Sequence, residues 1–92
     1  MVVFVMSVTL YASWVHSLKE KRMVVQSLCG RMKKFNASIL ESDAQDLHQT
    51  IVLSIAFLSS DSAQSHRYSE KLISFIEEHT DAEIMDIFVE QV

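Results

Sequence analysis

Basic side chains gather in one segment of the chain, residues 17–36, where their spacing suits phosphate chemistry. The segment holds six basic residues against one acid, a net charge of +5, while the remainder holds two against eleven acids, a net charge of −9. The six are Lys19, Lys21, Arg22, Arg31, Lys33 and Lys34. Ammonium and guanidinium groups neutralise phosphates and gain affinity from the counterions they release. The distribution predicts one side of the protein that favours anions.

The spacing within this segment allows two interpretations. Lys19, Arg22, Gln26 and Lys33 stand at i, i+3, i+7 and i+14, which places them on one flank of a helix. Such a stripe can contact consecutive phosphates. Lysines also cover solvated helix faces, and cations in a last helical turn are stabilised by the helix dipole without any ligand. Both interpretations, a phosphate-binding face and a solvated face, remain open.

Catalytic and metal-binding constellations are missing from the sequence. The four histidines share no metal-ligand spacing on any one expected element: His16, His48, His66 and His79. Asp46 and His48 are close in sequence, but no nucleophile accompanies them, so a polar hairpin surface explains them better. Cys29 lies among apolar residues and is expected in the core. We expect no enzyme, no metal, no cofactor and no small-molecule substrate.

Six elements must position the basic segment, in the order strand, helix, strand, strand, helix, strand. Alternating apolar residues predict strands over residues 2–11, 36–42, 49–59 and 83–92. Helical spacing predicts helices over 18–35 and 62–79, the first begun by a capping box of Ser17 and Glu20 and the second by Asp61. Right-handed crossovers then favour an α+β, ferredoxin-like sandwich, with a four-stranded antiparallel sheet and two helices on one face.

Composition favours one small cytoplasmic domain over residues 1–92. The hydrophobic fraction of 49% is ample for a core at this length. A single cysteine excludes an internal disulfide and fits a reducing compartment. The apolar start lacks a preceding basic residue and is shorter than the ~20 residues of a spanning helix, so it indicates a buried strand and no membrane association.

The open face of the expected sheet is unusually apolar. By strand parity it carries Val3, Val5, Val52, Leu58 and Phe88, with Leu40 and Ile84 beside them. Contiguous apolar surface favours a partner, and we expect a homodimer through this face. The face lacks the aromatic pairs on which RNA-recognition motifs stack bases. RNA, if bound, is expected on the basic helix and its flanking loops.

Three short motifs resemble the YlxP-like family of small bacterial proteins. They are Ser17-Leu18-Lys19-Glu20-Lys21-Arg22, Phe35-Asn36-Ala37-Ser38 followed by Glu41, and Asp46-Leu47-His48-Gln49. The resemblance covers essentially the whole chain and implies the same ferredoxin-like fold. It also implies a link to RNA or the ribosome, with Lys19, Lys21 and Arg22 as candidate contacts. For Asn36, Ser38, Glu41 and Gln49 it implies a structural role or a place on the same surface.

Two functions of different classes follow from these features. The first is a non-enzymatic module that binds RNA or ribosomal subunits through the basic helix. The alternative is a protein-interaction module that acts as a homodimer through the open sheet face.

Overall fold

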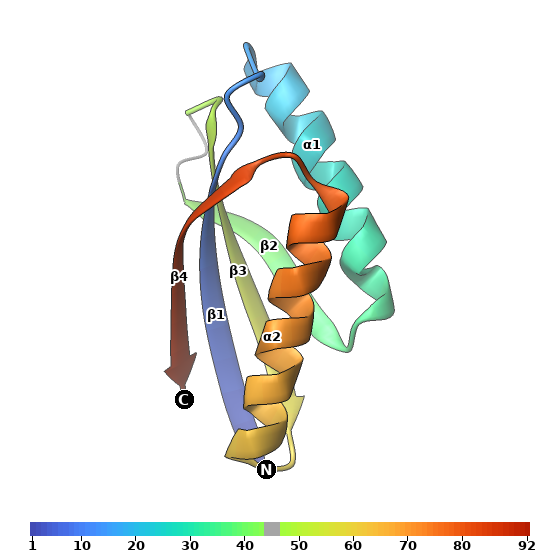
Figure 1. Ribbon diagram of the computed structural model, residues 1–92, viewed down its shortest axis with the longest axis vertical. Coiled ribbons are helices and arrows are strands. Elements are labelled where there is room, and N and C mark those ends of the chain that lie inside the picture. The colour runs from blue at the N-terminus through green and yellow to red at the C-terminus, as the bar shows by residue number, and fades with distance from the viewer. Residues whose placement is uncertain (44–46) are drawn as a thin grey trace.

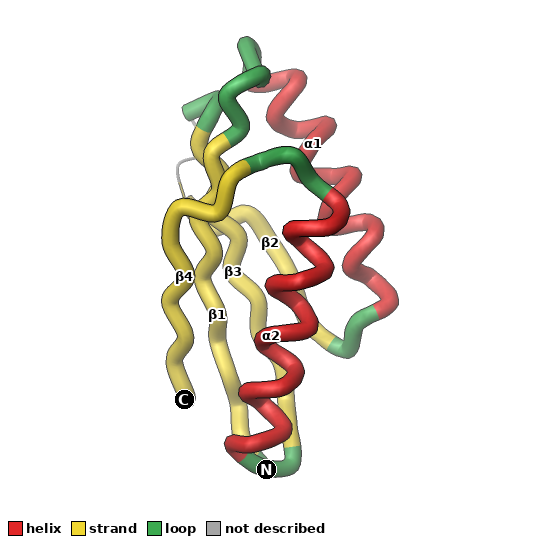
Figure 2. Tube along the Cα trace, in the orientation of Figure 1, coloured by secondary structure: helices red, strands yellow, loops and turns green. Residues whose placement is uncertain are grey.

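A computed structural model describes residues 1–43 and 47–92 of the chain. The elements are β1 (Val2–Tyr11), α1 (Leu18–Arg31), the 3₁₀ turn η1 (Met32–Lys34), β2 (Ala37–Asp43), β3 (Thr50–Ser59), α2 (Ser62–His79) and β4 (Glu83–Gln91). The strands form one antiparallel sheet in the order β2-β3-β1-β4. Both helices lie on the same face of the sheet (Figures 1 and 2). The predicted ferredoxin-like sandwich is confirmed.

The core lies between the sheet and the helices. Every second residue of β1 is buried, and the residues of β3 opposite them in the register are buried too. Helix α2 supplies Leu72, Phe75 and Ile76 to this layer, whereas α1 supplies Leu28 and the η1 turn supplies Met32. The alternating apolar side chains of the strands and the helically spaced apolar side chains of α2 thus pack into one apolar layer.

The first helix ends earlier than its apolar spacing predicts. Helix α1 ends at Arg31, and residues Met32–Lys34 tighten into a 3₁₀ turn. The Phe35 N–H then bonds to the Met32 carbonyl at 3.0 Å, and the backbone of Phe35 is already extended. Such a tightened last turn satisfies carbonyls that an α-helix end would leave open.

Strand β4 contains an irregularity that its apolar pattern does not reveal. The pairing with β1 shifts between Thr9 and Leu10, so that Leu10 lies opposite Ile84 and Thr9 opposite Asp86. Met85 is the extra residue. Ile84 therefore turns to the helix side and packs against the core, and its expected place on the open face is wrong.

Neither helix lies over β4, which forms one edge of the sheet (Figure 1). Ile87 and Val89 consequently stay exposed although they pair with buried β1 residues on the helix side. No helix among the described residues is long and apolar enough to cross a membrane.

Candidate nucleic-acid interface

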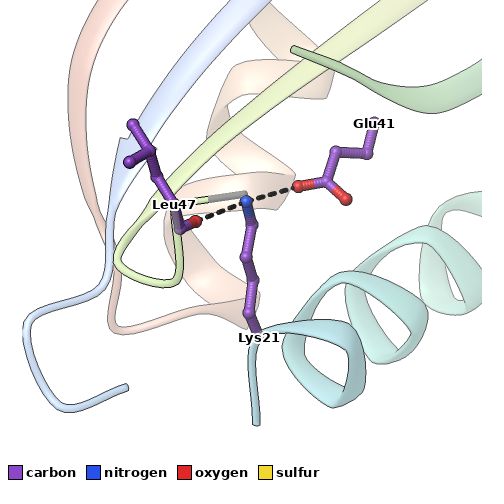
Figure 3. A network of polar contacts seen from close by, with 3 residues as sticks. All are labelled: Lys21, Glu41 and Leu47. Atoms are coloured by element: carbon purple, nitrogen blue, oxygen red, sulfur yellow. Dashed lines mark hydrogen bonds and ion pairs between the residues drawn. The ribbon is translucent and has the colours of Figure 1, made fainter. Parts of the chain in front are cut away.

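Lys21, one of the six predicted phosphate contacts, is buried in the structure. Only 1% of its surface is exposed. Its Nζ donates to the Leu47 carbonyl oxygen at 2.7 Å and forms an ion pair with Glu41 Oε2 at 2.7 Å (Figure 3). The ammonium therefore ties α1 to β2 and to the segment before β3. The expectation that Lys21 contacts phosphate is wrong, because the ammonium cannot reach a ligand without leaving these partners.

The sequence did contain a signal for this burial. Lys21 stands at i, i+4, i+7 and i+11 with Val25, Leu28 and Met32, the inner stripe of the helix. Glu41 shares the parity of Ala37 and Ile39, both packed against the core. A basic side chain on the inner face of the helix and an acidic side chain on the inner face of the strand predict a buried ion pair.

The other five basic residues of the segment are exposed. Lys19, Arg22 and Arg31 belong to α1, and Lys33 and Lys34 belong to the η1 turn. None of them forms an ion pair with a carboxylate whose side chain the structure describes. Lys19, Arg22 and the exposed Gln26 keep their predicted spacing on one flank of α1. These five cations, which we call the α1 basic surface, carry charge that no described carboxylate neutralises.

Lys34 leans away from the rest of this surface toward α2. Its Nζ lies 4.5 Å from the centre of the Phe75 ring and 5.4 Å from that of Phe35. Cations over aromatic rings gain electrostatic attraction and are held in place. Lys34 therefore stands at the border between the α1 basic surface and the second helix.

A groove runs between α2 and the turn that follows η1. It consists of two adjoining hollows, about 710 and 560 Å³ in volume, which share Asn36, Tyr68, Lys71 and Ser74 as lining residues. Arg67 lines the first hollow and Lys34 the second. We did not anticipate Arg67, Tyr68 or Lys71 from the sequence, because only the docking of the turn against α2 brings them beside Asn36.

The resemblance motifs mostly hold the fold together. Ser17 Oγ accepts the Glu20 N–H at 3.1 Å, which is half of the predicted capping box. Gln49 Nε2 donates to the Ser13 carbonyl oxygen at 3.1 Å, and the Gln49 carbonyl accepts the Ala12 N–H at 2.8 Å. With the Lys21–Glu41 pair, these contacts give Ser17, Lys21, Glu41 and Gln49 structural roles.

Most of the remaining motif residues lie on the surface, whereas Phe35 and Ala37 pack against the core. Asn36 N–H donates to the Tyr68 hydroxyl at 2.7 Å. Ser38 is exposed on the open sheet face, and Leu18 and Glu20 are exposed at the start of α1. Asp46 lies outside the described residues, so the structure does not test its pairing with His48.

The predicted apolar patch is present on the open sheet face. Val3 and Leu58 lie opposite each other in the register of β1 and β3, and they are 38% and 55% exposed. Phe88 lies opposite Ser7 and is 61% exposed. Val5 and Val52 on the same face are half-buried by their neighbours in the sheet. Val3, Val5 and Leu58 are neighbours on this face, whereas the Ser7–Ser54 pair lies between them and Val52.

No three metal-ligating side chains come together within residues 1–43 and 47–92. Cys29 is half-buried in α1; burial raises the pKa of its thiol, and the nearby Glu41 carboxylate raises it further. A raised pKa makes a thiol a poorer nucleophile at neutral pH. The chemistry of Cys29 thus suits packing, and the prediction that the chain needs no metal stays a prediction.

Comparisons with known proteins return a family. Residues 3–89 match the family model described as "Protein of unknown function (DUF503)". The chain is also similar to "Uncharacterized protein YlxP" of Bacillus subtilis (strain 168), with 37% identity over 68 residues. This alignment covers 73% of the chain and 74% of the relative. The predicted resemblance to YlxP-like proteins is confirmed.

Proposed function

The chain belongs to the DUF503 family, and we propose that it is a non-enzymatic RNA-binding module that associates with ribosomal subunits in the cytoplasm. The α1 basic surface would make the contacts: Lys19, Arg22, Arg31, Lys33 and Lys34. One observation carries the proposal. These five cations are exposed and lack carboxylate partners among the described side chains, in a protein whose net charge is −4.

The placement of the cations supports phosphate binding. Lys19 and Arg31 are twelve residues apart on α1, which corresponds to roughly 18 Å along the helix axis. Cations spread over this length can neutralise several phosphates of one nucleic-acid strand and release their counterions. The acidic remainder of the chain repels phosphate and favours binding by this one surface.

Co-sedimentation with ribosomal subunits tests the proposal. Neutralising the exposed flank in a Lys19→Gln, Arg22→Gln, Lys33→Gln variant should abolish binding that the unaltered protein shows at low salt. The matched control is Met85→Glu, Gln91→Glu with Val92→Glu, which lowers the net charge equally at exposed positions on or just after β4. Equal binding by both variants would overturn the proposal.

A homodimer through the open sheet face is the second candidate function. The observation that favours it is the exposure of Val3, Leu58 and Phe88 on neighbouring strands of one face. Contiguous apolar side chains gain free energy when a partner removes them from water, at about 25 cal/mol per Å² of apolar surface. This role leaves the α1 basic surface free, because the helices cover the opposite face of the sheet.

A further inference from the structure

The two basic residues outside the basic segment point to the same groove. Arg67 and Lys71 are four residues apart on α2, both are exposed, and both line the first hollow. Lys71 also lines the adjoining hollow, where the Lys34 ammonium lies over the Phe75 ring. Cations from two distant parts of the chain therefore meet along one groove, although the surrounding chain is acidic.

The charges in the groove are available to a ligand. Lys34, Arg67 and Lys71 form no ion pair with any carboxylate whose side chain the structure describes. Glu70 and Glu78 also line the groove. Cations that share a groove with carboxylates fit a ligand that presents one or two phosphates at a time better than a dense polyanion such as a duplex.

Hydrogen-bond donors and apolar surface accompany the cations. The Tyr68 hydroxyl accepts the Asn36 N–H, which leaves its own proton for another acceptor. The Asn36 side-chain amide has no hydrogen-bond partner among the described residues. The half-buried rings of Phe35 and Tyr68 meet edge to face, 6.2 Å between centres, and offer apolar surface beside these donors.

We propose that this groove binds a short single-stranded RNA segment. Lys34, Lys71 and Arg67 contact its phosphates, and a base lies against Phe35 and Tyr68 with its edge hydrogen-bonded to the Asn36 amide. Basic grooves with aromatic surface are how proteins hold single strands. The inference rests on the proposed RNA-binding function and adds a second contact region, on α2, with its own class of ligand.

Fluorescence anisotropy with a labelled octauridine and with a labelled RNA duplex tests this site. An Arg67→Gln, Lys71→Gln variant should bind octauridine more weakly and bind the duplex as the unaltered protein does. Its slope of log affinity against log salt for octauridine should fall by about 1.4, since each single-strand phosphate contact contributes about 0.7. The control Met85→Glu, Gln91→Glu, with the same change of net charge, should keep the original slope.

A second variant checks the base contact. Asn36→Asp keeps the shape of the side chain but replaces its donor amide with a carboxylate, so it should also weaken octauridine binding. Normal octauridine binding by both groove variants would overturn the inference. The proposed function would stand without the groove if binding to ribosomal subunits were still lost in the variant Lys19→Gln, Arg22→Gln, Lys33→Gln. Failure of the unaltered protein to bind any RNA would overturn both, whereas preferential binding of an acidic peptide in the groove would overturn this inference alone.

Discussion

The Lys21 ammonium illustrates how burial decides the role of a single side chain. Its neighbours Lys19 and Arg22 share its charge and its motif, yet only Lys21 lies on the inner stripe of α1 and pairs with Glu41. Burying an ammonium is costly unless it is paired and hydrogen-bonded, and the Leu47 carbonyl completes that requirement. Lys21 therefore supports the surface on which the exposed cations stand.

Removing the partner of Lys21 should destabilise the protein strongly. We expect Glu41→Gln to lower the free energy of unfolding by about 3 kcal/mol, because it removes the negative charge that lies 2.7 Å from a buried ammonium. Urea denaturation measures the loss. In the double variant Lys21→Met, Glu41→Leu the loss should be smaller, since no charge remains buried. A loss below about 1 kcal/mol for Glu41→Gln would contradict the structural role.

Cys29 should show a pH dependence set by its surroundings. Burial and then Glu41 raise the pKa of the folded thiol, so the folded state holds its proton at a pH where the unfolded thiol has lost it. The resulting stabilisation is complete below the pKa of the unfolded thiol and is lost as the pH rises through the folded pKa. Iodoacetamide should therefore alkylate the folded protein more slowly than the unfolded chain at pH 8.5. The alkylation rate of Cys29 is measured across a urea series and corrected for the exposure of the thiol. Equal corrected rates in the folded protein and the unfolded chain would argue against the raised pKa.

At the scale of elements, the two helix starts were predictable because capping depends on local sequence. Asp61 Oδ1 accepts the Gln64 N–H at 2.8 Å, and Ser17 does the same for Glu20. The end of α1 and the irregularity in β4 were not predictable from local sequence. Phe35, just after η1, packs edge to face against Phe75 of α2, and the irregularity arises where β4 pairs with Thr9 and Leu10. The candidate site was likewise predictable only in its local part. The α1 basic surface is local in sequence, whereas the groove requires α2 to dock beside residue 36.

Loss of either helix cap should destabilise the fold modestly. We expect Ser17→Ala and Asp61→Ala each to lower the free energy of unfolding by about 1 kcal/mol, because each leaves a backbone N–H of the first turn unsatisfied. Asp61→Asn keeps an acceptor and should cost less. The exposed neighbour Ser62 provides a control, since Ser62→Ala removes no hydrogen bond present in the described structure. Urea midpoints unchanged in Asp61→Ala would contradict the capping role.

At the scale of the whole molecule, the sheet separates two surfaces of different chemistry. The helix layer carries the α1 basic surface, and the opposite face carries the apolar patch of Val3, Leu58 and Phe88. The two proposed functions therefore use different residues, although Leu58 of the patch also lines the first hollow of the groove. A dimer through the sheet would present two basic surfaces outward.

Sedimentation equilibrium tests the dimer. The unaltered protein should be dimeric at micromolar concentration, and Leu58→Glu should be monomeric because it buries a carboxylate against a second copy. Met85→Glu serves as the control, since Met85 is as exposed as Leu58 but lies at the irregularity in β4. A monomeric unaltered protein would remove this second function.

The salt dependence of RNA affinity tests the central claim most directly. Affinity of the unaltered protein for single-stranded RNA should fall linearly in log affinity against log salt. In Lys19→Gln, Arg22→Gln, Lys33→Gln the slope should be shallower by about 2, because three phosphate contacts of about 0.7 each are lost. An unchanged slope in this variant, or binding by the unaltered protein that salt does not weaken, would contradict phosphate recognition by the α1 basic surface.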